Sequence, residues 1–304
     1  MITVIRLFYI LLLTLLFGAR LNAQVELRTE YIGSSGFRDE DNKKTGGKGD
    51  AKIFSVNARI PFSVKMNENN RPTVWGMSIG GSYTSFNNEN MDRALGPDEI
   101  MNAQIGLFHM RPISERWSIL AMLGAGVYTS HTEVSDVGLN NVLGNGGVIF
   151  IWHLKDNLDL GLGPVINTLL GYPMVFPGIY FNWELNGRYE LKASAMNGLA
   201  VSAGVQLREK FMLKLIAELN GALALEKING KKMMFTHSYF VAGLQPEFMI
   251  NKSFSISATA GISAGRNAYY QERNLKSVFK SDDEKRDPRF TAAPYFSLGL
   301  KYGF

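Results

Sequence analysis

Histidine and serine are the side chains with which this sequence could hydrolyse a substrate, and their spacing argues against it. A nucleophilic serine needs a histidine within hydrogen-bond reach. Ser238 directly follows His237, but adjacent strand residues point to opposite faces, so this pair cannot act together. His109 lies among Met and Phe, which is typical of a wall or rim position. His131 begins a polar stretch and His153 precedes a turn, so we expect both to be interfacial polar residues.

Acidic and glycine-rich clusters also lack the pattern of a binding site. Residues 39–41 lack the third acidic ligand and the glycine of a calcium loop. The acidic residues 282–284 alternate with Lys and Arg, which indicates a solvated loop, and Gly144, Gly146 and Gly147 precede no phosphate-binding helix. The chain has no Cys, which excludes disulfides and thiolate sites. We predict no catalytic, metal-binding or cofactor-binding residues.

The start of the chain has the pattern of a secretory signal peptide. Arg6 supplies the positive charge, the apolar run 7–17 follows, and Ala23 is a small residue suited to the position before cleavage. The run is shorter than the roughly 20 residues that a membrane helix needs. The sequence therefore predicts a signal peptide over residues 1–23 and one domain over residues 24–304.

Apolar residues recur at every second position throughout that domain. Such runs begin near residues 25, 54, 75, 101, 117, 148, 158, 179, 199, 211, 240, 254 and 292. A period of two is typical of a strand with one apolar and one mixed face. Beyond the signal peptide no apolar run approaches the length of a membrane helix, so the domain is either soluble or crosses a membrane as strands.

The connections between these strands alternate in length. Short turns are expected near residues 112, 156, 209 and 252, and long polar loops over residues 33–50, 87–99, 131–141, 226–233 and 272–289. A soluble sandwich has no reason to separate its loops in this way. A bacterial outer-membrane barrel does so, because its short turns face the periplasm and its longer loops face outside.

The last strand carries the family resemblance. Ala292, Pro294, Phe296, Leu298, Leu300, Tyr302 and Phe304 share one apolar face, and the sequence ends on that aromatic residue. This closing strand resembles that of Gram-negative outer-membrane β-barrels, where a terminal aromatic is part of the signal read by the assembly machinery. Aromatic residues near strand ends, including Trp75, Trp117, Trp152, Phe211, Phe248 and Phe254, fit the interfacial belts of such barrels. The domain resembles uncharacterised outer-membrane barrel families with a signal peptide and a single barrel.

If both chain ends lie on the periplasmic side, an up-and-down barrel must have an even number of strands. Residues 189–197 either form a short strand that returns at Asn197-Gly198 or interrupt the eighth strand. The sequence therefore predicts an all-β, transmembrane, antiparallel up-and-down barrel of 12 or 14 strands.

The mixed faces of the strands should line the lumen. They carry Glu26, Arg28, Glu30, Asn57, Arg59, Asn102, Gln104, Asn182, Glu184, Asn186, Lys214, Glu218, Gln245 and Glu247. Such a lining suits a wet pore or a closed network of ion pairs. The sequence indicates a passive channel or small-solute transporter, with a structural or adhesion barrel acting through its external loops as the alternative. We expect it in the cell outer membrane, without enzymatic activity. The expected partners are outer-membrane lipid, the assembly machinery and small solutes, but not nucleic acid, since the net charge of +5 mixes both signs.

Overall fold

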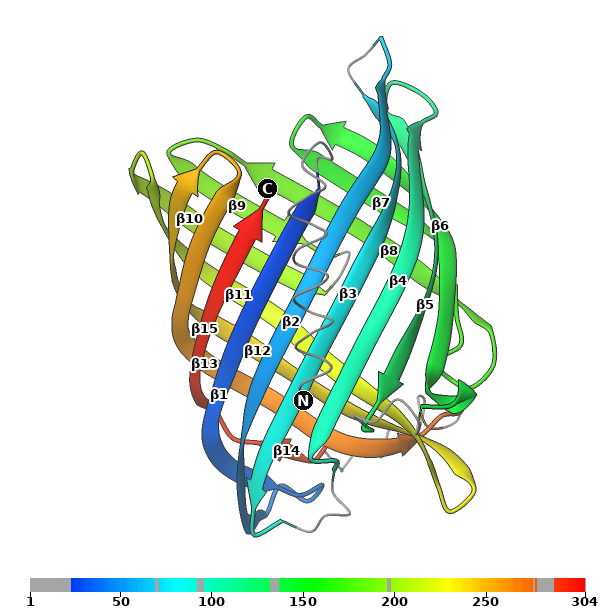
Figure 1. Cartoon of the computed structure of the whole chain (residues 1–304), viewed down its shortest axis with the longest axis vertical. Coiled ribbons are helices and arrows are strands. Elements are labelled where there is room, and N and C mark those ends of the chain that lie inside the picture. Colours follow the sequence, from blue (N-terminus) through cyan, green and yellow to red (C-terminus); the bar gives the residue numbers. More distant parts are fainter. Residues whose placement is uncertain are drawn as a thin grey trace.

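The computed structural model describes residues 23–68, 71–91, 96–131, 137–195, 198–275, 277 and 287–303, and these ranges are almost entirely antiparallel strand (Figure 1). The predicted signal peptide lies outside the described residues except for Ala23. The terminal Phe304 and the acidic residues 282–284 also lie outside them.

Each strand of the fold pairs with the next along the chain. The elements are β1 (Gln24–Arg38), β2 (Lys44–Met66), β3 (Pro72–Glu89), β4 (Glu99–Pro112), β5 (Trp117–Thr129), the 3₁₀ turn η3 (Leu139–Asn141), β6 (Val142–Lys155), β7 (Leu158–Asn167), β8 (Met174–Leu185), β9 (Tyr189–Ser194), β10 (Leu199–Arg208), β11 (Phe211–Ile228), β12 (Lys231–Asn251), β13 (Phe254–Glu272), β14 (Arg289–Phe290) and β15 (Ala293–Tyr302).

The sheet closes on itself. β15 pairs with both β13 and β1, and the two residues of β14 pair with the same two neighbours, so β14 and β15 are one closing strand. Over the described residues the ring therefore has fourteen strands. The predicted up-and-down barrel is confirmed, and the count of 14 rather than 12 holds because Tyr189–Ser194 forms the short returning strand β9.

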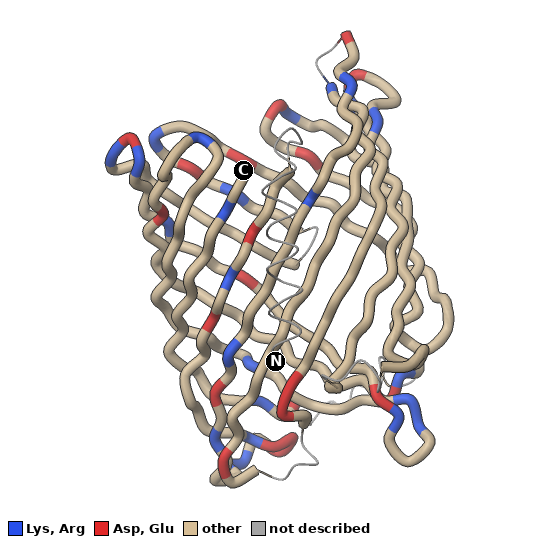
Figure 2. The backbone as a smooth tube through the Cα atoms, viewed as in Figure 1, with Lys and Arg blue, Asp and Glu red and all other residues tan. Residues whose placement is uncertain are grey.

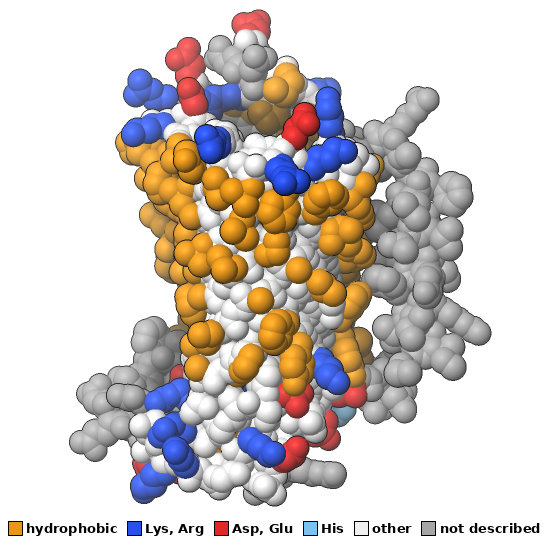
Figure 3. Space-filling view, turned by 90° about the vertical axis from the view of Figure 1, so that its left-hand side faces the viewer, with side chains coloured by type: hydrophobic (Ala, Val, Ile, Leu, Met, Phe, Trp, Pro, Cys, Tyr) orange, Lys and Arg blue, Asp and Glu red, His pale blue; other side chains and the backbone are white. Residues whose placement is uncertain are grey.

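The period of two separates a lipid face from a lumen face. On β15, buried and exposed residues alternate without a break: Tyr295 is fully buried inside the barrel, whereas Phe296 and Leu298 are 52% and 59% exposed. Figure 3 shows the result as a band of apolar side chains around the wall, with charged side chains gathered above and below it. Large apolar residues on the outside of a closed sheet indicate contact with lipid.

Two aromatic belts set the height of that band. Trp75, Trp117, Trp152 and Phe248 are exposed at the end with the short turns, and Trp117 stacks on Trp152 with ring centroids 5.9 Å apart. Tyr83 and Phe240 are exposed at the other end of the band. Trp75 to Tyr83 on β3 and Phe240 to Phe248 on β12 each span nine residues, which matches the roughly 9–11 residues of a tilted membrane strand.

This closed, lipid-facing sheet is an outer-membrane β-barrel. Val25 pairs with Tyr302, so the first and last strands meet at the short-turn end, which is the periplasmic end. Among the described residues, no helix has the length and hydropathy to cross a membrane.

The loop predictions are partly wrong. Residues 226–233 hold only a tight Asn229-Gly230 turn with positive φ at both positions, and most of residues 33–50 belongs to β1 and β2. The polar sequence there predicts loops, but it forms strands that extend beyond the bilayer, where the outer face of a strand no longer needs to be apolar. The barrel wall is consequently uneven: β2 and β12 have 23 and 21 residues, whereas β7 has 10 and β9 has 6.

Candidate functional site inside the barrel

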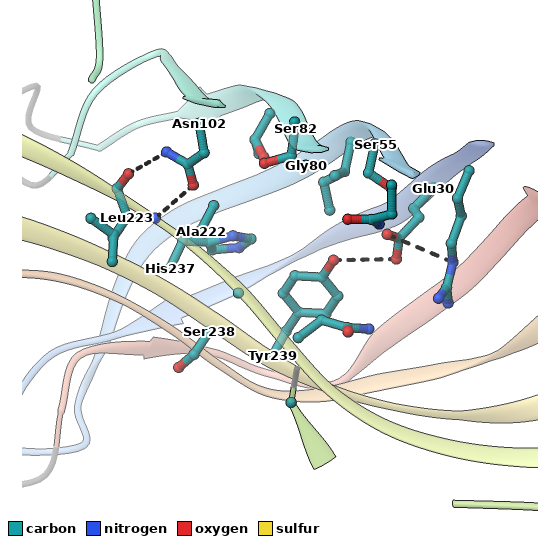
Figure 4. Close-up of a pocket in the computed structure, with 18 of the residues that line it drawn as sticks. Glu30, Ser55, Gly80, Ser82, Asn102, Ala222, Leu223, His237, Ser238 and Tyr239 are labelled. Atoms are coloured by element: carbon teal, nitrogen blue, oxygen red, sulfur yellow. Dashed lines mark hydrogen bonds and ion pairs between the residues drawn. The ribbon is translucent and has the colours of Figure 1, made fainter. Parts of the chain in front are cut away.

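The lumen holds a cavity of about 500 Å³ between β1–β5 on one side and β11–β12 on the other (Figure 4). Hydroxyl, amide and carboxylate side chains contribute to the wall from every side, among them Glu30, Ser55, Ser82, Asn102 and Tyr239, and about half of the wall is apolar. They reach the cavity because alternate residues of each strand point inward. A cavity of this kind offers hydrogen bonds to a polar solute from several strands at once.

The Arg28 cluster lies in the wall of this cavity. Arg28 forms an ion pair with Glu218 at 2.7 Å and lies 3.7 Å from Glu30. Tyr295 accepts a hydrogen bond from Arg28 at 2.7 Å and donates one to Glu30 at 2.6 Å, and Tyr239 donates to the same Glu30 oxygen at 3.2 Å. One cation between two carboxylates leaves the cluster with a net negative charge.

The Lys214 cluster repeats this arrangement closer to the periplasm. Lys214 pairs with Glu190 of β9 at 2.8 Å and with Glu247 of β12 at 2.7 Å, and Ser255 donates a hydrogen bond to Glu247 at 2.8 Å. Lys192 also lies 3.4 Å from Glu190, so this cluster balances two carboxylates with two cations. Of the two clusters, only the Arg28 cluster has a net negative charge, which attracts cations into the cavity.

The external half of β11 crosses the lumen and forms the roof of the cavity. Beyond Leu219 this strand pairs only with β12. Its other edge is held by side-chain amides: Asn102 donates to the carbonyl of Leu223 at 2.6 Å and accepts from its N–H at 3.3 Å, while Asn141 donates to the carbonyl of Leu225 at 2.5 Å (Figure 4). Asn102 thus takes the place of a neighbouring strand.

An apolar core seals the barrel above this roof. We call it the external core; it comprises buried side chains of β1–β4 and β11–β15, including Ile32, Phe37, Phe86, Phe235 and Phe290. The guanidinium of Arg266 lies within it, 3.9 Å from the centroid of the Phe290 ring, and donates to the carbonyl of Gly49 and to Nε2 of His237. Among the described residues, these packed apolar side chains occupy the interior of the barrel on the external side of the cavity.

Four buried polar atoms of cavity-lining residues have no hydrogen-bond partner among the described residues: Nε of Arg28, Oγ1 of Thr236, Oγ1 of Thr84 and Nδ1 of His237. The last two belong to residues that are 1% and 0% exposed. Because arginine can only donate, the bond from Arg266 makes Nε2 of His237 an acceptor, which assigns the proton to Nδ1. A buried polar group without a partner is costly, so both atoms are suited to a bound water or solute.

The comparisons with known proteins give a family but no activity. A family model described as a domain of unknown function, DUF6268, matches residues 19–303. The chain belongs to the DUF6268 family. No curated protein matches the sequence.

Solved structures that resemble the DUF6268 barrel are distant. The KdgM porin bound to disordered oligogalacturonate has 7% identity and a TM-score of 0.31, with 92% of this chain and 99% of that chain covered. The translocator domain of the autotransporter NalP from Neisseria meningitidis has 14% identity and a TM-score of 0.35 (93% and 88% covered). An outer-membrane channel from Pseudomonas putida F1 has 8% identity and a TM-score of 0.39 (92% and 94% covered). These TM-scores are too low to support a conclusion, and the assignment of the fold is based on the strand pairing of this chain.

Most of the predicted lumen residues of the DUF6268 barrel do lie inside it. Glu26, Arg28, Glu30, Asn57, Asn102 and Gln104 line the cavity, and Lys214, Glu218, Gln245 and Glu247 lie in or beside the two clusters. Asn182 and Glu184 lie on β8, away from the cavity. Asn186 is wrongly assigned to the lumen, because it follows the end of β8 in an exposed turn.

Sequence reasoning missed the tyrosine and glutamate partners of the clusters. Tyr239 and His237 were missed as lumen residues because the strand was expected to begin at Phe240, yet the alternation of β12 extends back to Lys231. Glu190 was missed because β9 is too short to show a clear period. In β9 and at the start of β12, the signal that could have identified these residues is the alternation of inward and outward side chains, which continues through polar segments that resemble loops.

His153 takes part in a serine–histidine–aspartate chain at the periplasmic mouth. Its Nε2 lies 2.7 Å from Oγ of Ser118, and its Nδ1 lies 2.6 Å from Oδ1 of Asp159. In serine hydrolases the acid is buried and the serine meets the substrate. Here Ser118 is 4% exposed and the Asp159 side chain is 25% exposed. The serine is therefore buried from a substrate and the acid is the more exposed residue, which is the opposite of the arrangement in a serine hydrolase. His109, by contrast, stacks on Trp75 on the wall at 4.0 Å between ring centroids.

Proposed function

We propose that this protein is a gated channel or transporter for small cationic or neutral polar solutes. The observation that carries the proposal is the cavity of about 500 Å³ inside the barrel, lined by hydroxyl, amide and carboxylate groups. Its size suits a small solute. The Arg28 cluster, with the two carboxylates of Glu30 and Glu218 around one cation at the cavity wall, supports the preference for cations.

The seal above the cavity supports a gated channel rather than an open pore. The Asn102–Leu223 bonds and the external core close the lumen over the cavity. A solute must therefore displace part of this closure or leave by another route. The sequence alone indicates a passive channel or small-solute transporter, and the proposed gate adds a closed state to such a channel.

Conductance in planar bilayers tests this proposal. Purified protein should give brief, cation-selective openings in potassium chloride, and the reversal potential in a salt gradient should have the sign of potassium permeation. A steady large conductance without selectivity would contradict the gate. The absence of any current above that of lipid alone, with and without candidate solutes, would contradict the channel.

The adhesion alternative is favoured by one observation, which is the extension of β1–β3 and β11–β13 beyond the outer aromatic belt around the external core. Such an extension presents a folded surface outside the membrane. Cells that carry the barrel should then bind a surface or partner that cells without it do not bind, and deletion of the Asn229-Gly230 turn region should abolish that binding without loss of folded barrel.

We propose no enzymatic activity, and the Ser118–His153–Asp159 chain provides the test. Purified barrel should not hydrolyse p-nitrophenyl butyrate faster than Ser118→Ala does. An activity lost in Ser118→Ala and in His153→Ala, with both variants folded, would overturn this expectation.

A further inference from the structure

The ring of strand pairing is interrupted between β8 and β11. β9 pairs with β8 only from Asn182 to Leu185, with one further backbone bond from Ala195 to Phe181. Over the described residues the remaining edge of β8, from Met174 to Tyr180, has no strand beside it. Opposite it, β11 has no strand on its β10 side beyond Leu219. The short strand β9, with 6 residues, therefore leaves two unpaired strand edges that face each other.

The opening is closed on its external side. Arg273, just after β13, donates to the carbonyls of Leu169 and Thr168 at 2.8 and 3.0 Å. Its backbone N–H donates to the carbonyl of Lys232 at 2.9 Å. Burial lowers the pKa of the Arg273 guanidinium from its ordinary value. These bonds tie the β7–β8 connection to the start of β12, so the gap is a bounded window rather than a slit. We call it the β8–β11 window.

The window lies at the level of lipid. Val175 and Ile179, on the outer face of the free β8 edge, are 65% and 61% exposed, and they lie on the part of β8 far from the periplasmic end marked by Trp183. Backbone N–H and C=O groups without partners are costly in a bilayer and are tolerated where they line a cavity. The cavity described above borders the β11 side of the window, because Gly198 and residues 219–223 of β11 form part of its wall.

A packed apolar cluster lies on the inner side of β4–β8, the strands that lead to the free edge of β8. We call it the apolar wall; it consists of inward-facing side chains of β4–β8, namely Phe108, Met110, Leu120, Met122, Ile149, Ile151, Val165 and Tyr180. The opposite side of the lumen carries the Arg28 and Lys214 clusters. The lumen thus offers one apolar and one acidic side to the same passenger, and an unpaired strand edge at the point where it meets lipid.

We infer that the β8–β11 window is a lateral route between the lumen and the outer leaflet, and that its passenger is a small amphiphile with a cationic or neutral polar end. The apolar part of the passenger lies along the apolar wall, and its polar end meets the acidic clusters and the free backbone groups of β8. This inference rests on the proposed function, since it names the class of solute that the gated lumen carries. It also explains how a barrel sealed by the external core can release a solute.

Lipid quenching of a single fluorophore tests the window. The chain has no Cys, so bimane attached to one introduced cysteine reports one position. Phe176→Cys faces the lumen at the free edge of β8, and Met122→Cys faces the lumen from β5, which is paired on both sides. Phe176, Val165, Gly147 and Met122 lie on one hydrogen-bonded row, so the two labels are matched. Leu123→Cys, which faces lipid, is the positive control.

In liposomes of brominated phosphatidylcholine, the label at position 176 should lose fluorescence as the label at position 123 does, and the label at position 122 should keep it. Equal, weak quenching at positions 176 and 122 would overturn the window. Met174→Cys, also inward on the free edge, replaces Phe176→Cys if that variant does not show the heat-dependent gel shift of a folded barrel.

Block of the potassium current tests the passenger. Dodecyltrimethylammonium below its micellar concentration should reduce the current, and tetramethylammonium, which has the same head without the chain, should not. Equal effects of the two ions would overturn the amphiphile. A barrel that shows quenching at position 176 but carries no current refutes the proposed function, whereas a barrel with a current but no quenching refutes the window.

Discussion

The charged side of the lumen, formed by β1, β9, β11, β12 and β15, and the apolar wall of β4–β8 are stabilised in different ways. On the charged side, long strands are held in register and their lumen groups are linked in the Arg28 and Lys214 clusters. Figure 2 shows charged residues along the strands around β1, while β4–β6 carry few between their ends. The apolar wall has packed methyl, thioether and ring groups, and it ends at the free edge of β8.

This difference indicates where the barrel is rigid and where it can open. The ion pairs on the charged side resist separation, because removal of one partner leaves another charge buried. Apolar contacts are not directional and can be exchanged for contacts with a passenger. We therefore expect the conformational change of the barrel at the β8–β11 window and at the Asn102 bond, and not at β1 or β15.

The largest effect should come from the charged side. Arg28→Met removes the only described cation beside Glu30 and Glu218 in that cluster, and we expect a loss of about 3 kcal/mol of unfolding free energy, as for a buried pair with one partner removed. Urea unfolding in detergent micelles, followed by the gel shift of the folded barrel, measures it. Arg28→Lys, which keeps the charge, is the control, and equal stability of Arg28→Met and wild type would show that the cluster is not structural.

A charge on the lipid face should have the next largest effect. Leu298 is 59% exposed on the outside of β15, so Leu298→Arg should lower stability by about 2–4 kcal/mol. The same unfolding measurement applies, with Leu298→Ala as the control for the lost side chain. If Leu298→Arg is as stable as Leu298→Ala, the assignment of inside and outside faces is wrong.

Loss of the bonds that hold β11 across the lumen should lower stability less than either of these substitutions. Asn102→Leu removes both bonds to Leu223, and we expect a loss of about 1–3 kcal/mol because a backbone pair is left without partners. The roof should also open more often, which single-channel recording would register as longer openings. Gln104→Leu, on the same face of β4, is the matched control. Unchanged open times in Asn102→Leu would show that the roof is not the gate.

The smallest effect on stability is expected at Glu184. It lies opposite Lys192 across β8 and β9, whereas Lys214, which the sequence suggested as a neighbour, pairs with Glu190 and Glu247. Glu184→Gln should change the unfolding free energy by less than about 1 kcal/mol and should reduce the preference for potassium over chloride. A large loss of stability with unchanged selectivity would place Glu184 in a closed ion-pair network instead.

The sequence could predict a large part of the barrel because successive residues of a membrane strand face lipid and lumen in turn, which gives apolar residues a period of two. Leu298 and Tyr295 were assigned to their correct faces from that period alone, and so were Arg28, Lys214 and Asn102 of the candidate site. The period fails where a strand leaves the bilayer. For residues 226–233 and 33–50 the sequence therefore predicts loops where the structure has mostly strand, and it does not identify the inward Tyr239 and His237.

The alternation of side chains thus determined by itself that the chain forms a lipid-facing barrel and which residues turn inward. Only the tertiary structure decided which inward residues meet. Whether Arg28 lies beside Glu218, and whether Asn102 takes the place of a strand beside β11, depends on the register and tilt of strands far apart in sequence. The free edge of β8 arises from the shortness of β9 relative to its neighbours, a property of strand pairing around the ring that no single segment encodes.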